Sequence, residues 1–385
     1  MLLAHYFAML PDILGNKGLF YSIYTVVIYL LALFCNLSEL IKLYQIITAD
    51  IFIFDELIRN FVITGLHFTS LLKCLFLRSK LGGRIFKKII NYEKQVYESG
   101  NKQIVAIYEQ VLSSMRRTRN YYAVGILVVV VFYIAAPSFR DPYYIQKGNR
   151  TIVVQQMPLS SWTPLEENYW FSYIWTSSAG AYLTIFFVTT DLTCYSFIMF
   201  GVCQINILNH FISNFYQYSK DIEINQECTQ EESFRILQRE LIMMHQEAIT
   251  YIKELNSALK NIMFLDFVPS SIQLAGIIFQ LMTNLNIIQC ILLGEFILTL
   301  IARIFIYCNN AHMLSVQSQK VASTWYNIPW NELPEDVRRD MVFCIMRAQK
   351  PLCITIGALG PISLTTFLAI LKGTYSYMML LMTIE

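Results

Sequence analysis

The sequence has little charge: only 15% of its 385 residues are Asp, Glu, Lys or Arg, and 55% are hydrophobic. Soluble domains carry about 25% charged residues. The mean hydropathy is accordingly positive, at +0.46. A formal net charge of +2 supplies no whole-protein field that would attract nucleic acid or an acidic substrate. Composition therefore favours a protein in contact with membrane lipid, and nucleic acid is not an expected partner.

The sequence also lacks the patterns of catalysis and of cofactor or metal binding. Its nine cysteines are scattered without CxxC pairs, which argues against a disulfide framework or a zinc site and favours a role as small packing residues. Its five histidines lie on different segments. We find no Gly-rich phosphate loop and no nucleophile elbow. We therefore expect neither an enzyme nor a cofactor. The first twelve residues lack the basic region and cleavage site of a signal peptide, so the first span is expected to insert as its own signal.

Long apolar stretches predict seven membrane spans, because a bilayer core about 30 Å thick needs about 20 mostly apolar residues per helix. The predicted spans are 19–44, 51–77, 121–139, 170–210, the two halves of 264–308, and 351–382. The polar run Thr283-Asn284-Leu285-Asn286 allows 264–308 to fold back on itself. The fourth span is too long for a perpendicular crossing and should tilt or project. Lys73 is expected to snorkel from the end of the second span.

The distribution of lysine and arginine predicts the direction of these spans. The N-terminus and the segments between spans two and three, four and five, and six and seven together contain twenty-one of these residues. The opposite set of segments contains five, two of them at helix edges. The N-terminus is therefore predicted to be cytoplasmic and the C-terminus extracellular. G-protein-coupled receptors cross in the other direction and are disfavoured. Asn149-Arg150-Thr151 is an N-glycosylation sequon in a predicted outside loop.

Two amphipathic helices are predicted on the cytoplasmic side. Thr229-Gln230-Glu231-Glu232 fits a capping box. Apolar residues then alternate three and four apart over four heptads. This seam comprises Phe234, Leu237, Leu241, Met244, Ala248, Tyr251, Leu255, Ala258 and Ile262. A second helix, after Pro334, places Val337, Met341, Cys344, Ile345 and Ala348 on one face. Such faces either pack within the chain or join subunits, and we favour the second because apolar surface outside the bilayer needs a cover.

The C-terminal third resembles the signature of insect odorant receptors, and the layout of the whole chain agrees with that family. The residues that carry the resemblance are Ser318-Gln319-Lys320-Val321-Ala322, Tyr326, Trp330, Arg347-Ala348-Gln349-Lys350-Pro351-Leu352, Thr355, Gly357, Ser363-Leu364, Thr366-Phe367 and Leu371-Lys372-Gly373-Thr374-Tyr375-Ser376. The resemblance implies a heterotetramer with the odorant receptor co-receptor, assembled through a cytoplasmic anchor. The large cytoplasmic insertion of the co-receptor is absent, which implies the odorant-sensing subunit.

The resemblance also implies a cation pore lined by the last span and gated by an apolar constriction near its outer end. Matching the family motif to Thr374-Tyr375 puts the gate at Met378, with Leu381 and Met382 just above. Helical periodicity places Leu371, Met378 and Met382 on one face. An apolar ring can block ions by dewetting. The alternative is that these residues form ordinary packing or lipid-facing surface.

In the family the ligand cavity lies in the outer halves of spans two to six, and the predicted orientation identifies the corresponding residues. The candidates are Phe61, Gly65, Phe132, Tyr133, Ala136, Trp175, Ser178, Ala179, Tyr182, Phe279, Met282 and Thr283. Some of these small and aromatic residues also fit plain helix packing. Asp191, Asp266, Glu295 and Arg303 lie within spans and form either a transporter's ion path or structural pairs. The lack of repeat symmetry favours pairing.

The sequence thus predicts an all-α integral membrane protein with seven transmembrane helices and cytoplasmic helical extensions. Residues 1–312 would hold the first six spans and the ligand pocket, 313–350 a cytoplasmic loop and anchor helix, and 351–385 the pore-lining helix. The expected function is a subunit of an odorant-gated, non-selective cation channel in the plasma membrane of an olfactory neuron, with a small volatile odorant and membrane lipid as partners. A gustatory-type receptor channel, a G-protein-coupled receptor and a transporter are the alternatives.

The predicted orientation can be tested with an epitope tag after Glu385. We expect antibody to stain the tag on unpermeabilised cells, because seven crossings from a cytoplasmic N-terminus end outside. Replacing Asn149 by Gln should also remove any glycan-dependent shift in gel mobility. Staining that requires permeabilisation would contradict the orientation.

Overall fold

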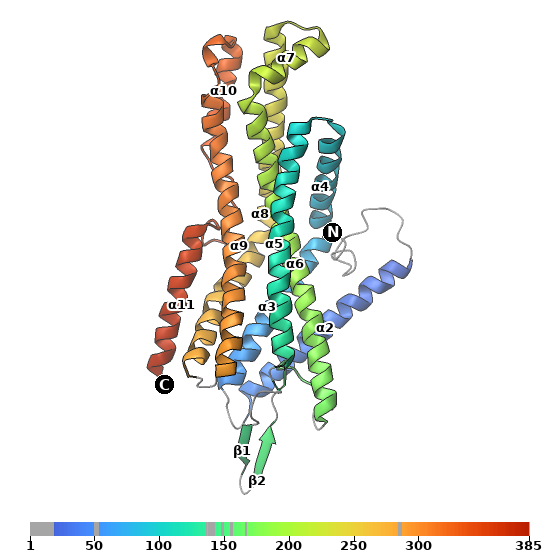
Figure 1. Cartoon of the computed structure of the whole chain (residues 1–385), viewed down its shortest axis with the longest axis vertical. Helices are drawn as coiled ribbons and strands as arrows, with labels where there is room; N and C mark the ends of the chain where they lie inside the picture. Colours follow the sequence, from blue (N-terminus) through green and yellow to red (C-terminus); the bar gives the residue numbers. More distant parts are fainter. Residues whose placement is uncertain are drawn as a thin grey trace.

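The computed structural model describes residues 19–49, 54–135, 137, 143–147, 150–154, 157–165, 168–283 and 287–384, and these are almost entirely helical (Figure 1). The N-terminal residues on which the expectation about a signal peptide rests lie outside the described part. The helices are α2 (Leu19–Ile47), α3 (Phe54–Arg78), α4 (Lys80–Glu98), α5 (Lys102–Ala135), α6 (Tyr169–Ser213), α7 (Phe215–Gln226), α8 (Gln230–Thr283), α9 (Ile287–Tyr326), the 3-10 turn η2 (Trp330–Glu332), α10 (Glu335–Ala348) and α11 (Leu364–Ile384).

The predicted helical membrane fold is confirmed. Six described helices, α2, α3, α5, α6, α8 and α9, are long and apolar enough to cross a membrane. The seventh predicted span corresponds to α11, which has 21 residues and packs along α8 and α9. Apolar side chains of α5 such as Val124, Leu127 and Val131 are more than half exposed, which is the pattern of a helix that contacts lipid.

Several spans continue far beyond a bilayer. The 45 residues of α6 and the 54 of α8 correspond to about 68 and 81 Å of helix, against a core of about 30 Å. Helix α8 ends at Thr283 and α9 begins at Ile287, where the sequence predicted a reversal. Residues 284–286 lie outside the described part. The third predicted span, 121–139, corresponds to the C-terminal part of α5, which begins nineteen residues earlier, at Lys102.

The extensions form a helical bundle at one end of the molecule, with α4, α7 and α10 around the upper parts of α5, α6, α8 and α9 (Figure 1). At the other end, β1 (Tyr143–Lys147) pairs antiparallel with β2 (Arg150–Val154). The helix ends that were predicted to be cytoplasmic thus lie together at the end of the molecule opposite the hairpin. The sequence did not predict the hairpin, and Asn149 lies outside the described residues.

The predicted cytoplasmic helices are present, but their seams are covered by the chain itself. The capping box is formed: the backbone N–H of Thr229 donates to Glu232 Oε2 at 3.0 Å, and the N–H of Glu232 donates to Thr229 Oγ1 at 3.3 Å. Within the seam, Phe234 stacks against Phe215 of α7, and the Tyr251 hydroxyl donates to the Phe197 carbonyl of α6 at 2.8 Å.

The preference for subunit joining by these seams is therefore wrong. On α8 the seam is buried apart from the half-buried Met244, Ala258 and Ile262. On α10 Val337, Met341, Cys344 and Ala348 are buried and Ile345 is half-buried. Heptad spacing indicates an apolar seam but does not distinguish a helix of the same chain from one of another. The exposed apolar side chains of α10 are instead Val342, Phe343 and Met346 on its other face.

The last span begins later than predicted, at Leu364 rather than Pro351. Residues 351–363 form a tight turn in which Gly357 and Gly360 have positive φ values of 52° and 129°. Such values favour glycine and end a helix. The turn is held by neighbouring helices, because the N–H of Thr355 donates to Asn256 Oδ1 at 2.8 Å and that of Leu352 to Ser318 Oγ at 2.9 Å. The signature residues Thr355 and Gly357 therefore shape the connection that leads into the N-terminus of α11.

The intrachain seam yields a stability prediction. Leu255→Ala should lower the free energy of unfolding by about 2–5 kcal/mol, because it opens a cavity at a fully buried position of α8. Met243→Ala, at a half-exposed position of the same helix, is the matched control and should have little effect. Thermal unfolding of the detergent-purified protein measures both. Equal melting temperatures for the two variants would place the seam outside the core.

Candidate functional site

Four helices meet at a cluster of four fully buried charged side chains. Lys73 of α3 donates to Asp191 Oδ1 of α6 at 2.5 Å and to Asp266 Oδ2 of α8 at 2.7 Å. Arg303 of α9 donates from Nε to Asp191 Oδ2 at 2.9 Å and from Nη2 to Asp266 Oδ1. The exposed fraction of each of the four is 3% or less. Two cations and two anions alternate in a closed ring whose formal charges cancel.

Hydroxyl groups complete this ion cluster. Tyr307 of α9 donates to Asp191 Oδ1 at 3.2 Å, Tyr122 of α5 donates to Asp191 Oδ2 at 3.3 Å, and Thr69 donates to Asp266 Oδ1 at 3.3 Å. Every carboxylate oxygen thus accepts more than one hydrogen bond, except Asp266 Oδ2, which accepts one from Lys73. Burying a charge costs several kcal/mol unless it is paired and hydrogen-bonded, and this arrangement supplies both conditions.

The cluster confirms the predicted pairing of Asp191, Asp266 and Arg303 and corrects the expectation for Lys73. Lys73 does not snorkel: its exposed fraction is 0% and its ammonium lies between the two aspartates. Its position near the end of a hydrophobic stretch suggested that its ammonium would reach the membrane–water interface. The carboxylates that draw it inward come from α6 and α8, more than a hundred residues away in the sequence. Glu295 is half-buried and is not part of the cluster.

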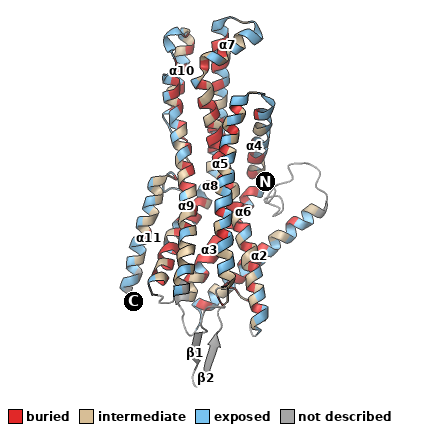
Figure 2. Cartoon of the chain, in the orientation of Figure 1, coloured by how far each residue is buried: buried red, intermediate tan, exposed pale blue. Residues whose placement is uncertain are grey.

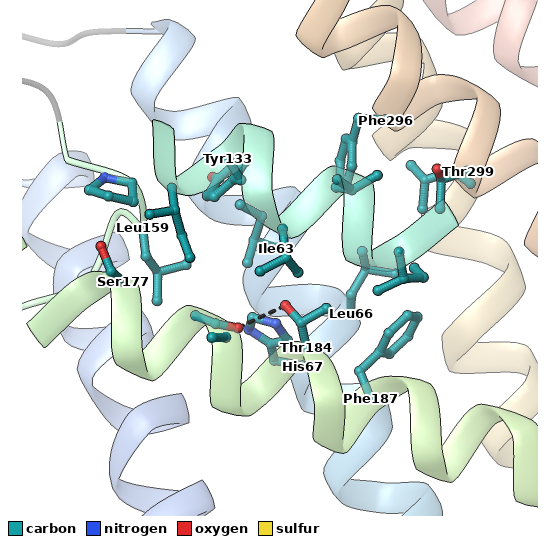
Figure 3. A pocket seen from close by; sticks show the side chains of 18 of the residues that line it. Ile63, Leu66, His67, Tyr133, Leu159, Ser177, Thr184, Phe187, Phe296 and Thr299 are labelled. Carbon is teal, nitrogen blue, oxygen red and sulfur yellow. Dashed lines mark hydrogen bonds between the residues drawn. The ribbon is translucent and has the colours of Figure 1, made fainter. Parts of the chain in front are cut away.

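An apolar cavity of about 80 Å³ lies next to the ion cluster, with Tyr122 and Arg303 in its lining (Figure 3). Helices α3, α5, α6 and α9 supply its walls, and Pro158 and Leu159 close it from the outer loop. The side chains labelled in the close-up are Ile63, Leu66, His67, Tyr133, Leu159, Ser177, Thr184, Phe187, Phe296 and Thr299 (Figure 3). A water molecule needs roughly 10–15 Å³ of such volume, so the cavity has room for a small molecule only.

A few polar groups interrupt the apolar lining. Ser177 Oγ is buried and has no hydrogen-bond partner among the described residues. Thr184 Oγ1, in contrast, donates to the Gly180 carbonyl at 2.7 Å. His67 Nδ1 lies 2.7 Å from Glu39 Oε1 of α2. The cavity also contacts Arg303 and Tyr122, which bind Asp191. It is therefore an apolar chamber in which the Ser177 hydroxyl has no partner among the described residues, and it shares a wall with the ion cluster.

Of the predicted ligand residues, Tyr133 lines this cavity. Ala136 lies outside the described residues, as does the side chain of Thr283. Phe61, Phe132, Ser178 and Met282 are exposed, and Phe279 is buried. Gly65 faces Gln273 of α8, since a Cβ there would meet the Gln273 amide. Trp175 contacts Phe34, and Tyr182 donates to the Ile28 carbonyl at 2.8 Å, so both point toward α2. Ala179 is buried in a small apolar cluster with Cys35, Ile63, Leu159 and Leu183.

The ligand residues predicted on α6 lie in the right segment of that helix but on a neighbouring face. The cavity is lined by Thr176, Ser177, Gly180, Ala181, Thr184 and Phe187, whereas the prediction named Trp175, Ser178, Ala179 and Tyr182. Both faces carry small and polar residues, so residue type does not separate them. Asp191 was the signal available in the sequence. Thr184 lies seven residues, or two helical turns, before this buried charge, so it is on the same inward-facing side of α6. His67 and Arg303 were not named as ligand residues.

Helix α11 lies at an edge of the molecule and presents a long exposed side (Figures 1 and 2). Thr374 is buried against α8, where its hydroxyl lies 3.4 Å from the Ser271 carbonyl. Met378 is half-buried, whereas Met382 is 45% exposed. The side chain of Leu381 lies outside the described residues. Tyr375 and Met379 are exposed as well, so the uncovered side of α11 is apolar and aromatic.

Comparisons with known proteins agree on one family. A family model described as 7tm Odorant receptor matches residues 53–375. Odorant receptor 10 of Aedes albopictus is 31% identical over 198 residues, which cover 51% of this chain and 49% of that protein. Odorant receptor Or2 of Anopheles gambiae is 29% identical over 143 residues, covering 37% and 38%. The matched segment thus spans about half, or less, of the length of these relatives.

The fold is similar to solved insect receptor structures. The olfactory receptor OR5 of Machilis hrabei in complex with eugenol superposes with a TM-score of 0.75 and 14% identity, covering 100% of this chain and 97% of that one. A second structure of the same receptor gives a TM-score of 0.76 and covers 96% and 91%. At this identity the likeness shows the fold.

The ion cluster predicts an unequal effect of single and paired substitutions. Lys73→Met should lower the free energy of unfolding by about 3–5 kcal/mol, because it leaves an uncompensated buried carboxylate. Lys73→Met combined with Asp266→Asn restores neutrality and should recover part of that loss. Thermal unfolding of purified protein measures both.

Lys88→Met is the control, since Lys88 forms an exposed pair with Glu254 at 2.8 Å. It should change stability by less than about 1 kcal/mol. A double variant that is no more stable than Lys73→Met alone would contradict the importance of charge balance.

Proposed function

The chain belongs to the insect odorant receptor family, and on that basis we propose that it is the odorant-sensing subunit of a ligand-gated, non-selective cation channel in the plasma membrane of an olfactory neuron. The single observation that supports a sensing role best is the apolar cavity with its unsatisfied Ser177 hydroxyl. Burial of apolar surface supplies affinity for a volatile molecule, and one hydrogen bond orients it.

We propose that the ligand is small and largely apolar, with one hydrogen-bonding group. The volume of about 80 Å³ is well below that of pockets for drug-sized ligands, which measure about 300–1,000 Å³. Tyr133 of α5 and Ser177 of α6 both line the cavity (Figure 3). Among the residues predicted from sequence, Tyr133 is the one that this proposal retains.

The proposed coupling runs through the wall that the cavity shares with the ion cluster. Arg303 and Tyr122 contact the cavity and also bind Asp191, which joins them to α3 and α8 through Lys73 and Asp266. A ligand that shifts these side chains changes the packing of α8, against which α11 lies. Ligand binding opens the channel only if the open conformation binds the ligand more tightly than the closed one.

The proposed pore lies between subunits. One copy of α11 has a covered side along α8 and an uncovered side with Met382 at its outer end. Several copies around an axis would bring the uncovered sides together, and apolar residues there would form the gate. Met378, which was predicted as the gate, is half-buried and would lie at the margin of that surface. The proposed partner is the co-receptor subunit, and the exposed Val342, Phe343 and Met346 of α10 offer an apolar contact for it.

The cavity predicts a contrast between two adjacent serines. Ser177→Ala should raise the half-maximal concentration of hydroxyl- or carbonyl-bearing odorants about two- to tenfold, the effect of losing one hydrogen bond. Ser178→Ala, on the exposed side of α6, is the matched control and should respond like the wild type. Dose–response currents in cells that co-express the co-receptor measure both. The same shift in both variants would exclude a direct role for Ser177.

The pore can be tested by cysteine accessibility. A membrane-impermeant thiol reagent added outside should reduce the odorant-evoked current of the Met382→Cys variant but not that of the wild type. The wild type is the control for any reaction of the reagent with the nine native cysteines. No odorant-evoked cation current across a broad odorant panel, with the co-receptor present, would contradict the channel proposal itself.

A further inference from the structure

A buried acid and a buried histidine meet at the wall of the apolar cavity. His67 of α3 lines the cavity, and its Nδ1 lies 2.7 Å from Oε1 of Glu39 of α2. The side chain of Glu39 is 0% exposed and that of His67 is 6% exposed. Glu39 does not line the cavity, so Nδ1 is engaged away from it. The other ring nitrogen, Nε2, has no hydrogen-bond partner among the described residues.

Backbone contacts hold Glu39 in place behind the imidazole. Asn60 Nδ2 of α3 donates to the Glu39 carbonyl at 3.3 Å and to the Ser160 carbonyl at 2.7 Å. The N–H of Trp162 donates to the Ser38 carbonyl at 3.0 Å. These bonds connect this stretch of α2 to α3 and to the outer loop that closes the cavity. The carboxylate therefore has a defined position relative to the cavity wall.

Electrical neutrality determines where the protons of this pair reside. Glu39 Oε2 is buried without a hydrogen-bond partner, and in the described part of the chain Glu39 forms no ion pair except with His67. An uncompensated charge in such a place is strongly unfavourable. The pair is neutral when it holds two protons, one of them in the short contact between Oε1 and Nδ1. Because imidazole is intrinsically a stronger base than a carboxylate, the second proton resides on Nε2 rather than on Oε2.

The cavity thus presents hydrogen-bond donors. His67 supplies an Nε2–H, and Ser177 supplies a hydroxyl that has no partner among the described residues. Thr176 and Thr299, in contrast, donate to carbonyls of the preceding helical turn at 2.8 and 3.0 Å. Arg303, which also lines the cavity, is balanced by the two aspartates of the ion cluster. The group that these walls lack is an uncharged acceptor.

We propose that the odorant is a neutral carbonyl compound, an aldehyde, ketone or ester, whose oxygen accepts a hydrogen bond from Nε2–H of His67. This inference rests on the proposed sensing function of the cavity and adds the chemical class of the ligand. A carbonyl oxygen has two lone pairs and can accept from Ser177 as well. A protonated amine would face an imidazolium, and a carboxylate would leave a net negative charge in an apolar chamber. Glu39 is a positioning residue, which orients the ring and strengthens its N–H as a donor.

Two ligands of the same shape test this class. 2-Pentanone and 2-methyl-1-pentene differ in that a CH₂ group replaces the carbonyl oxygen. Their half-maximal concentrations are measured from currents in cells that express the full-length chain with the co-receptor. The readout is the ratio of the ketone value to the alkene value. Damage to the fold or to gating shifts both values together and leaves this ratio unchanged.

Two variants of His67 separate its two nitrogens. In His67→Asn the amide takes the place of Nδ1 and can still donate to Glu39, but the cavity loses its N–H. The ketone-to-alkene ratio should rise about five- to tenfold, the effect of losing one hydrogen bond from a charged donor. His67→Gln places an amide N–H near the position of Nε2 and should stay within about twofold of wild type. His312→Asn, at a half-buried position outside the cavity lining, is the matched control and should leave the ratio unchanged.

Infrared spectroscopy detects the same bond without any current. 2-Pentanone labelled with ¹³C at its carbonyl is added to the purified full-length protein, and its C=O stretch is compared with that in hexane. A hydrogen bond from His67 should lower the stretching frequency. Glu39→Gln should retain binding but reduce this shift, because a neutral imidazole is a weaker donor than a charged one. His67→Asn should reduce the shift further.

The outcomes distinguish this inference from the proposed function. A lowered C=O stretch that depends on His67, without current from any odorant, would support the carbonyl site and contradict the channel. Odorant-evoked current with the same ketone-to-alkene ratio in the wild type and in His67→Asn would overturn the inference and leave the channel intact. Failure of the ketone to bind, or a stretch at its hexane frequency, would also overturn the inference.

Discussion

Charge balance inside the membrane is the constraint on which the rest of this structure depends. Lys73, Asp191, Asp266 and Arg303 each come from a different helix, and none of them is stable in a low-dielectric interior without the others. The cluster therefore determines the relative register of α3, α6, α8 and α9 at the middle of the bundle. Apolar packing among lipid-exposed helices is weakly directional, so a hydrogen-bonded ring of charges supplies specificity that packing alone does not.

The position of the cluster also separates two chambers of different chemistry. On the outer side, the small cavity is apolar, and Arg303 and Tyr122 contribute to its wall. On the other side, a larger chamber of about 460 Å³ between α4, α5 and α6 has Glu93, Arg116 and Arg119 among its lining residues. Helices α5 and α6 line both chambers.

Part of the candidate site was accessible to sequence reasoning, and the rest depended on distant contacts. The pairing of Asp191, Asp266 and Arg303 could be predicted because unpaired charges in a span are too costly. The participation of Lys73 could not, because its partners lie on other helices and its place near the end of a hydrophobic stretch fitted an interface equally well. On α6, the family resemblance and the predicted orientation indicated the segment of the cavity, and helical periodicity was used to choose its face. It missed the face by one residue, because Ser177 and Ser178 are alike in type and differ only in what packs against them.

The sequence by itself determined the membrane class and the family, and it predicts a direction for the spans, because hydrophobic length, charge bias and local motifs are properties of the chain alone. It also determined local features such as the capping box at Thr229, whose partners are three residues apart. Only the tertiary structure decided that the heptad seam of α8 is covered within the chain. It alone decided that residues 351–363 turn back on α8 and α9, and that four charges meet. Each of these depends on which helices become neighbours, and no local pattern encodes that choice.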